Sequence, residues 1–567
     1  MLQGEIRRAV RYITERELFA VHNPHGSYTS NGTTTTVLDA LRNKHPLPQL
    51  LHPRDLPKFD FPPPPLPSLL FTDEQMSEVA TKLGGASGLN GVDGHTLKTW
   101  LLYHRKSSSK LRDAFRRLVT WQANNNIPWA AIRALKSKRG LALNKFPGVR
   151  PIGIGNIEDR YVAKILLADA GPSAADAAST LSLSAGLSAG IEGAVHAANQ
   201  AWTDATLDDN FGFLLIDARN AFNELDRNMM LYVLRHIWPR GARFAFNSYK
   251  RWSTVLFHDS ISGTATTITS ATGVTQGDPI AMIAYSLTLT PLSRQLLPEF
   301  PELLQLWVAD DNSAAGSFGT LKLYFNRLVV LGKPYGYHVQ PNKCKLVTRS
   351  SNFLRAGAFF RTRSTAVALT THARLLGSHL GSLEETEAWL GDQVATWSQR
   401  VTLLAAVTTE YPQSAYVALQ RSLQLEWSYL QRTTPCSPAL YQPIEDAIAN
   451  TFIPAQFQLS AAHPSLPPRS LTRLPLKWGG MAIFDPVATC TAITSKPAAK
   501  SVPSSLPPSS TALPWKCHPI VNPCPMASLP QGRPRQQNMQ QAWKASKRHC
   551  LSLPVTGLTA AATPDAG

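Results

Sequence analysis

Two apolar runs that end in aspartate constrain the fold of this chain more than any other feature. The first run is FGFLLID, which ends at Asp217, and the second is LLQLWVADD, which ends at Asp310 and Asp311. Short apolar runs of this kind predict buried strands. If the two strands are neighbours in one sheet, their ends bring three carboxyl groups to a single sheet edge, which holds side chains more rigidly than a loop.

The adjacent acids Asp310 and Asp311 have two explanations when they are considered alone. Aspartate and asparagine are favoured in β-turns, because their side chains hydrogen-bond to the nearby backbone. The alternative is a cation site, in which Mg²⁺ relieves the repulsion between the two carboxylates. The rest of the chain is needed to choose between a turn and a cation site.

The composition favours a polyanionic partner. The 567 residues include 56 Lys and Arg against 38 Asp and Glu, a formal charge of +18, which points to nucleic acid first. The sequence has no uncharged apolar run of about 18 residues, so no membrane segment is expected. Its six cysteines are sparse and unevenly spaced, which favours a reducing, intracellular compartment over a disulfide framework.

The order of hydrophobic patterns predicts an α+β fold. Between residues 211 and 348, strand-like runs alternate with helical segments such as LDRNMMLYVLRHIW and DPIAMIAYSLTLTPL. This order predicts helices on one face of a mostly antiparallel sheet. Residues 384–485 have helical periodicity with Pro-containing breaks, which predicts a helical bundle.

The ends of the chain have a different character. Residues 1–71 are loosely patterned and finish in FDFPPPPLPSLL, which indicates a polyproline linker or brace. Thr72 and Gln75 then form a capping-box pattern that predicts a helix start. Beyond residue 487 the sequence is rich in Pro and Ser, and we expect it to be disordered.

Two segments close to the acids also carry functional side chains. In GVTQGDPIAM, Gly277 allows close backbone approach, Gln276 offers an amide to a substrate, and Asp278 and Pro279 suit a helix start. Upstream, LNKFPGVRPIGIG contains two basic residues that could reach a triphosphate. Considered alone, the first segment is explained by a turn followed by a helix, and the second by a solvated basic loop.

Taken together, the motifs resemble those of a reverse transcriptase of a non-LTR-type eukaryotic retroelement. The ordered segments are NKFPGVRPIGIG, LLIDARNAFNELDR, GVTQGDPIAM, LWVADDNS, YGYHVQPNKCKLV and RLLGSHLGS. The resemblance extends over residues 130–485 and favours the cation site over the simple turn. It implies a right-hand polymerase with fingers, an antiparallel-sheet palm and a helical thumb.

The resemblance also divides the chain into five parts. These are an N-terminal extension with a Pro-rich linker (1–71), fingers with N-terminal helices (72–210), a palm with the polymerase motifs (211–383), a helical thumb (384–486) and a disordered basic tail (487–567). Neither the motifs nor the composition indicates an oligomeric state.

The acids acquire catalytic roles from the resemblance. Asp217, Asp310 and Asp311, with the backbone carbonyl of Ala218, match the positions that hold two Mg²⁺ ions, for which Mn²⁺ can substitute. In such sites two cations clamp the attacking and leaving oxygens of an in-line phosphoryl displacement. The implied reaction is attack of a primer 3′-hydroxyl on the α-phosphate of a nucleotide.

Five further residues match substrate-binding positions. Lys145 and Arg150 match the basic pair that contacts the triphosphate, and Gln276 and Gly277 match the motif that lies across the palm. Phe222 matches the aromatic steric gate, whose ring collides with a ribose 2′-hydroxyl and so favours DNA precursors. The alternative for Phe222 is packing in the core.

The sequence also departs from the family pattern. Lys343 matches the lysine of an NxxKT motif, a candidate general acid for pyrophosphate, but Gln340 and Cys344 replace the usual Asn and Thr. Lys345 could substitute for Lys343. Val308 stands where the family usually has an aromatic residue, so altered fidelity or activity is a further expectation.

The sequence therefore predicts template-directed DNA synthesis from RNA, with an RNA template, a DNA or RNA primer and dNTPs as partners and no membrane. The resemblance suggests a nuclear location. Three alternatives stay open: an RNA-dependent RNA polymerase, a decayed or domesticated copy that binds nucleic acid without catalysis, and a basic structural RNA-binding protein.

Overall fold

The computed structural model describes residues 21–30, 33–145, 148–259, 262–362 and 365–494. All described residues belong to one compact unit, which lies within Met1–Pro519. The first 20 residues of the predicted extension and the predicted tail from residue 495 onward lie outside the described residues. No helix in the described part of the chain is long and apolar enough to cross a membrane.

The largest sheet contains the two acid-bearing runs. Its strand order is β13-β10-β5-β9-β8, and its strands are β5 (Phe211–Ile216), β8 (Leu304–Val308), β9 (Asp311–Ser317), β10 (Lys345–Val347) and β13 (Ala368–Thr370). Every neighbouring pair is antiparallel except β10 with β13. The mostly antiparallel sheet that the sequence predicts is therefore present.

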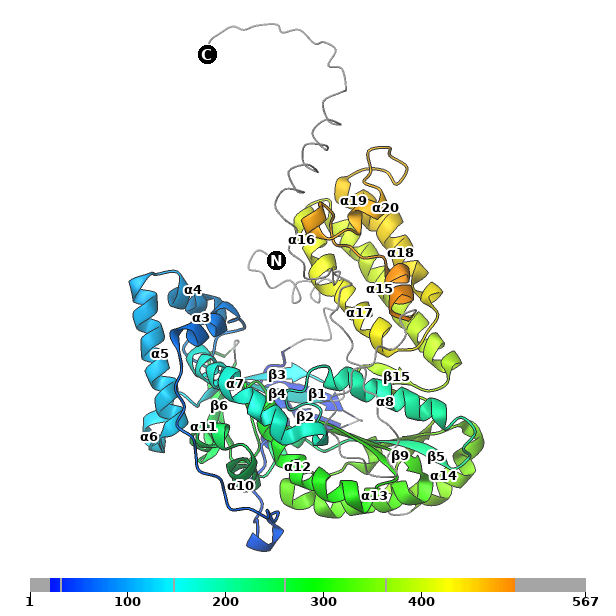
Figure 1. The fold of residues 1–567 in the computed structure, drawn as a ribbon. Helices are drawn as coiled ribbons and strands as arrows, with labels where there is room; N and C mark the ends of the chain where they lie inside the picture. The colour runs from blue at the N-terminus through cyan, green and yellow to red at the C-terminus, as the bar shows by residue number, and fades with distance from the viewer. Residues whose placement is uncertain (1–20, 31–32, 146–147, 260–261, 363–364, 495–567) are drawn as a thin grey trace, which may run out of the picture. The chain divides into compact units, whose positions relative to one another are not determined.

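Both faces of this sheet are covered, which corrects the prediction of helices on one face. Leu214 and Ile216 of β5 pack toward α10 (Arg227–Ile237), α12 (Ala281–Glu299) and α13 (Phe318–Leu331). Phe211 and Phe213 pack instead against α8 (Gly190–Asp204) and the β14–β15 hairpin (Ala373–Leu375, Ser378–Leu380). Figure 1 shows α8 and α12 on opposite sides of the sheet. Because alternate side chains face opposite ways, a strand buried on both faces is a continuous apolar run.

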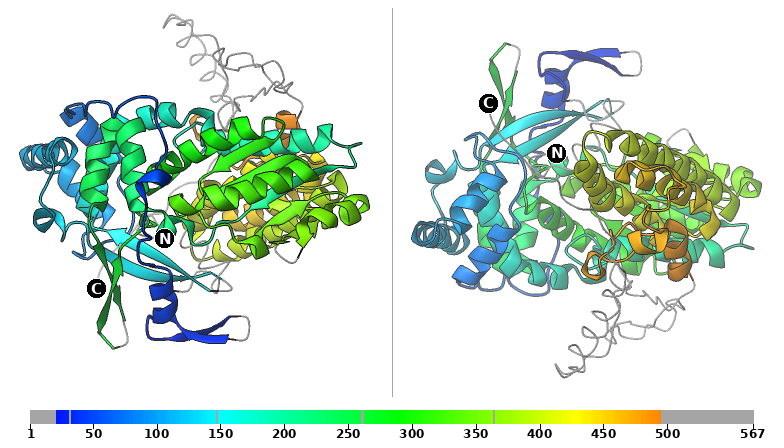
Figure 2. Two further views of the ribbon diagram at one scale, coloured as in Figure 1. Left: turned by 90° about the horizontal axis from the view of Figure 1, so that it is seen from below. Right: turned by 90° about the horizontal axis from the view of Figure 1, so that it is seen from above.

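A second sheet has the order β4-β3-β6-β7. It contains β3 (Lys138–Asn144), β4 (Val149–Gly155), β6 (Ser253–His258) and β7 (Ala265–Ser270), and β3 pairs parallel with β6. The N-terminal hairpin β1–β2 (Ser27–Ser30, Thr33–Thr36) and the β6–β7 hairpin project on the same side of the molecule (Figure 2). The N-terminal helix α2 (Val37–Asn43) packs on this second sheet.

Five more α-helices of the described chain precede the acidic runs, and the first three of them pack on the last, α7. They are α3 (Asp73–Thr81), α4 (Gly94–Leu102), α5 (Lys106–Asn124), α6 (Trp129–Ile132) and α7 (Ile157–Ala178). The predicted capping box is confirmed, because the Thr72 side chain accepts a hydrogen bond from the Gln75 N–H and the Gln75 side chain accepts one from the Thr72 N–H. The short helices α9 (Ala221–Glu224), α11 (Pro239–Tyr249) and α14 (Phe353–Phe360) complete this part of the chain.

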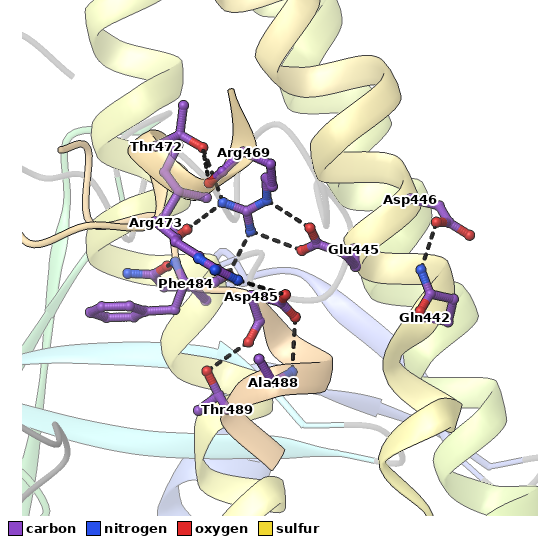
Figure 3. Close-up of polar contacts among 12 residues, drawn as sticks. Gln442, Glu445, Asp446, Arg469, Thr472, Arg473, Phe484, Asp485, Ala488 and Thr489 are labelled. Carbon is purple, nitrogen blue, oxygen red and sulfur yellow. Dashed lines mark hydrogen bonds and ion pairs between the residues drawn. The ribbon is translucent and has the colours of Figure 1, made fainter. Parts of the chain in front are cut away.

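Residues 383–494 form the predicted helical bundle. Its helices are α15 (Leu383–Val407), α16 (Pro412–Ala418), α17 (Gln424–Thr433), α18 (Gln442–Ala447), α19 (Ile453–Phe457), α20 (Arg469–Thr472) and α21 (Pro486–Thr494). Arg469 joins three segments of the bundle, since its guanidinium binds both carboxylate oxygens of Glu445 at 2.7 and 2.8 Å and also donates to the Ile483 and Phe484 carbonyls (Figure 3).

The structure moves the predicted start of the tail and decides between the two predicted roles of the Pro-rich segment. Helix α21 extends across the predicted tail boundary at residue 487, and its Cys490 is buried in the bundle core. The Pro-rich segment has no regular secondary structure but packs on the helices, since Leu69 and Phe71 are buried and Arg235 donates to the Pro64 carbonyl. It therefore acts as a brace.

Candidate active site

Asp310 lies in the turn of a tight β-hairpin, and Asp311 begins its second strand, β9. Val308 of β8 pairs with Asp311 of β9, so only Ala309 and Asp310 form the turn. Ala309 adopts a positive φ of 52°, which is costly for a residue with a Cβ and typical of hairpin turns. The prediction that LLQLWVADD ends as one strand is therefore wrong by three residues, because β8 ends at Val308 and the chain folds back at once.

The sheet register brings Asp217 to this hairpin. Strand β5 pairs antiparallel with β9, and the last paired residues are Ile216 and Asn312. One further step along both strands places Asp217 opposite Asp311. Residues that are directly opposite in an antiparallel pair project on the same face of the sheet. We call Asp217, Asp310 and Asp311 the acidic cluster.

The hairpin is fixed from two sides. The Ala309 N–H donates to the Ser184 hydroxyl at 2.8 Å, and the Tyr337 hydroxyl donates to the Asp310 carbonyl at 3.2 Å. On the neighbouring strand, the Gln340 N–H donates to the Asp217 carbonyl at 2.9 Å. The backbone that carries the acids is therefore held by residues from two distant parts of the sequence, the segment around Ser184 and residues 337–340.

The acidic cluster carries unrelieved negative charge. Loss of solvent, together with the charges of Asp310 and Asp217, raises the pKa of Asp311 to about 6, although the residue as a whole stays exposed. Burial also raises the pKa of Asp310, as does the charge of Asp217, while Lys145 and Arg150 act in the opposite direction. Like charges in close proximity disfavour ionisation unless a cation joins them.

The donor chemistry of this cluster fits a hard divalent cation. Carboxylate oxygens and a main-chain carbonyl such as that of Ala218 are the ligands that Mg²⁺ prefers. Two backbone hydrogen bonds hold this segment, one accepted by the Asp217 carbonyl and one donated by the Arg219 N–H. The Ala218 carbonyl takes part in neither of them. Among residues 21–494 as described, no three His, Cys, Asp or Glu side chains already converge as a metal-binding group. The metal-binding role of these four residues therefore stays a prediction.

Three predicted basic residues gather near the acids. Lys145 follows β3 and Arg150 lies in β4, where it is opposite Leu143, and Lys343 ends a short 3₁₀ turn (Pro341–Lys343). Partial loss of solvent lowers the pKa of Lys145, and the positive charges of Arg150 and Lys343 lower it further, while Asp217 and Asp310 oppose them. We call Lys145, Arg150 and Lys343 the basic cluster.

The basic cluster lacks carboxylate partners. Within the described part of the chain, none of its three side chains forms a hydrogen bond or an ion pair. Lys138, which begins the same β3 strand, behaves differently because its ammonium group lies 2.7 Å from the Asp278 carboxylate. Residues 146 and 147, at the tip of the β3–β4 hairpin, lie outside the described residues.

Gln276 and Gly277 pack against β4. The Gln276 carbonyl accepts a hydrogen bond from the Gly153 N–H at 2.9 Å, and a Cβ on Gly277 would lie 2.6 Å from the Gly153 carbonyl oxygen. Gly277 has a φ of 109°, so it must be glycine for two separate reasons. This contact holds the loop between β7 and α12 against β4.

The predicted helix start at Pro279 is wrong. Helix α12 begins at Ala281, and Ile280 occupies the cap position. The Asp278 carboxylate accepts hydrogen bonds from Lys138 and from the Tyr249 hydroxyl, so it serves as a buried ion-pair partner. Burial works against its charge, yet the Lys138 ammonium holds the pKa of Asp278 below its ordinary value.

Phe222 stacks on Tyr285 of α12. Their ring centroids lie 4.7 Å apart with an interplanar angle of 19°. Burial raises the pKa of the Tyr285 hydroxyl well above its ordinary range, and the charges of Asp310 and Asp311 raise it further. That hydroxyl has no hydrogen-bond partner among the described residues. Phe222 is thus placed by an aromatic residue that is itself close to the acidic cluster.

The departures from the family pattern have structural explanations. The backbone of Gln340, and not its side chain, binds Asp217, so asparagine is not required there. The Cys344 thiol is buried and donates to the Gln340 carbonyl, as a threonine hydroxyl could.

Val308 is buried in the core beneath α8, on the same face of the sheet as the acids. The RLLGSHLGS segment forms the β14–β15 hairpin, whose turn residues Leu376 and Gly377 both have positive φ.

Sequence reasoning missed Ser184, Tyr285 and Lys44. Ser184 and Tyr285 come from apolar or small-residue segments in which nothing marks them as unusual. Lys44 follows α2 in the N-terminal extension, and its charge interacts with those of Lys343, Lys145, Glu224 and Asp217. No motif in the extension signals this placement, since only tertiary packing brings it to the site.

Comparisons with known proteins identify partial likenesses. No family model and no curated protein sequence matches the chain. Candida tropicalis telomerase without its C-terminal domain has a TM-score of 0.33 and 12% identity, covering 49% of this chain and 61% of that one. Candida albicans telomerase with a fragment of telomeric RNA has a TM-score of 0.32 and 10% identity, covering 64% and 66%. The apo Candida tropicalis enzyme has a TM-score of 0.34 and 10% identity, covering 59% and 65%.

The chain thus spans less than two thirds of the length of each of these telomerases. A likeness of this degree does not establish a shared fold. The assignment of a function therefore depends on the residues of the site.

Proposed function

We propose that this chain is an RNA-directed DNA polymerase that extends a primer along an RNA template. The observation that carries the proposal is a surplus of negative charge in the acidic cluster directly beside a surplus of positive charge in the basic cluster. A nucleoside triphosphate with its divalent cation has the complementary arrangement of charge. In this proposal the acid-bearing sheet is the palm, the β3–β4 sheet belongs to the fingers, and α15–α21 form the thumb.

The residues of the site have distinct roles in the proposed reaction. Asp217, Asp310 and Asp311, with the Ala218 carbonyl, hold divalent cations, which when bound activate the primer hydroxyl and neutralise the departing pyrophosphate. Lys145 and Arg150 bind the triphosphate, Arg150 through a two-pronged contact. Lys343 is positioned to give a proton to pyrophosphate.

Phe222 is proposed to select the sugar. Its stacking on the buried Tyr285 ring limits its freedom to move aside for a 2′-hydroxyl. This proposal favours DNA synthesis over RNA synthesis. A non-LTR-type retroelement acting in the nucleus is the corresponding biological setting, with RNA template, primer and dNTPs as the partners.

The test is single-nucleotide primer extension on an RNA template by the full chain, with Mg²⁺ and either a dNTP or the matching rNTP. The proposal expects extension with the dNTP, none after chelation of the metal, and little with the rNTP. Preferential use of the rNTP would instead indicate an RNA polymerase. A folded chain that binds the primer–template but never extends it would indicate a non-catalytic copy.

A further inference from the structure

Lys44 occupies a fixed position beside the basic cluster although it comes from the N-terminal extension. Helix α2 buries Val37 and Leu41 in one small core with Ala142 and Val149 of the β3–β4 hairpin. The same hairpin carries Lys145 and Arg150. The extension is therefore attached to the element that presents the basic cluster.

The end of α2 is also attached to the acid-bearing sheet. The Lys44 N–H caps the helix by donating to the Ala40 carbonyl at 3.1 Å, and the Lys44 carbonyl accepts a hydrogen bond from the Asn220 amide at 2.9 Å. Asn220 lies three residues beyond Asp217 in the turn that follows β5. A few residues further on, the Gln49 side chain donates to the Lys333 carbonyl at 2.8 Å.

The side chain of Lys44 is half-buried and has no anionic partner in contact with it. Burial lowers its pKa, and the positive charges of Lys343 and Lys145 lower it further, against the weaker effects of Glu224 and Asp217. No ion pair or hydrogen bond involves its ammonium group among the described residues. Lys44 is half-buried, whereas Lys145 and Lys343 are exposed. Lysines that gather in this way without a counter-ion form a site complementary to a polyanion.

We infer that Lys44 is a phosphate-binding residue of the nucleotide site, so that the N-terminal extension completes the pocket for the polyphosphate of the incoming nucleotide. This inference rests on the proposed function. The polyphosphate is favoured over a backbone phosphate of the template because Lys44 interacts with both Lys145 and Lys343, which are assigned to the triphosphate and to pyrophosphate.

The first test is equilibrium binding of inorganic tripolyphosphate to the full chain by calorimetry, without metal, base or sugar. Wild type should bind it, with an affinity that falls as ionic strength rises. Lys44→Met should weaken binding about tenfold, as expected for loss of one charge-assisted contact. Lys44→Arg should retain most of the affinity.

Matched variants make this test specific. Lys58→Met removes an exposed lysine of the same extension and should leave binding unchanged. Lys44→Gln is the second variant if Lys44→Met does not fold, since it removes the charge but keeps a polar end group at this half-buried position. Lack of tripolyphosphate binding by wild type, or equal binding by wild type and both neutral variants, would overturn the inference.

Primer extension separates this inference from the proposed function. In an active chain, Lys44→Met should raise the KM for dNTP about tenfold while the KM for primer–template stays constant. The opposite pattern would assign Lys44 to nucleic acid and overturn the inference. A chain that binds tripolyphosphate through Lys44 but extends no primer would refute the polymerase proposal and leave the anion site standing.

Discussion

The acidic cluster and the basic cluster are assembled in different ways. The acids lie at the ends of hydrogen-bonded strands of one sheet, where the register of β5, β8 and β9 determines which residues face each other. The basic residues come from a hairpin of another sheet and from a 3₁₀ turn, joined only by tertiary packing. Strand register therefore places the acids, whereas the relative position of whole segments places the bases.

Charge balance further separates these clusters from the structural ion pairs. Lys136 lies 2.7 Å from Asp159, and Lys138 lies 2.7 Å from Asp278, so each buried lysine has its own carboxylate. The acidic and basic clusters have no such partners. Asp217 and Asp310 are half-buried, whereas all three residues of the basic cluster are exposed. Because a partly buried charge without a partner is costly, the unpaired carboxylates at this sheet edge indicate a site for a ligand of the opposite sign.

The largest expected effect follows removal of one acid. Asp310→Asn should reduce primer extension on the order of a thousandfold, as loss of a key electrostatic group typically does. It should not lower the thermal unfolding midpoint, because it also removes a repulsive charge. Activity and melting temperature of the same preparation check both parts. A variant that is fully active, or inactive only because it is unfolded, contradicts the assignment.

Two lysines of the β3 hairpin should have opposite phenotypes. Lys138→Met leaves Asp278 buried and unpaired, so we expect a loss of about 3–5 kcal/mol in the free energy of unfolding. Lys145→Met should change stability by about 0.5 kcal/mol or less and raise the KM for dNTP about tenfold. Urea unfolding and steady-state kinetics on both variants measure this contrast. If the two variants behave alike, the distinction between balanced and unbalanced charge fails.

The steric gate predicts a smaller effect on selectivity. Phe222→Ala should reduce discrimination against ribonucleotides roughly tenfold to a hundredfold, because the ring no longer occupies the space of a 2′-hydroxyl. The ratio of kcat/KM for dNTP and rNTP gives this value. Tyr285→Phe is the matched control, since it keeps the stacking partner and should preserve selectivity. Unchanged discrimination in Phe222→Ala would assign the residue to core packing.

The smallest effect concerns pH and cation binding. In the ion-free folded state the pKa of Asp311 is raised from 3.8 to about 6. This state therefore binds the Asp311 proton more tightly than the unfolded chain does. The folded state loses this stabilisation as the pH rises through 6 and the carboxyl group ionises. Mg²⁺ should therefore raise the melting temperature by about 2–4 °C at pH 7.5 and by less at pH 5. Differential scanning calorimetry at both pH values tests this, with Asp311→Asn as the control. An equal shift at both pH values would exclude these carboxylates as the ligands.

The sequence predicted those parts of the fold that depend on local pattern. The apolar runs of β5 and β8, the helix that follows Asp226 and the capping box at Thr72 were all legible, because side-chain periodicity and capping are local. Strand β9 was missed because its residues, DNSAAGS, are small and polar. Its strand conformation is imposed by pairing with β5 and β8 on both sides.

The candidate site, like the fold, was predictable from the sequence only where local pattern determines it. Asp217, Asp310 and Asp311 could be proposed from strand ends, and the strand register places Asp217 opposite Asp311, while their metal-binding role stays a prediction. The placement of Ser184, Tyr285 and Lys44 could not be predicted. Each is brought in by packing between segments far apart in sequence, which periodicity does not record.

The central claim is that the acidic cluster holds a divalent cation. The most direct measurement is binding of Mn²⁺ to the full chain, followed by electron paramagnetic resonance as free Mn²⁺ disappears. The account predicts saturable binding that Mg²⁺ displaces and that is lost in Asp310→Asn and Asp217→Asn. Absence of binding, or binding that both variants retain, would contradict it.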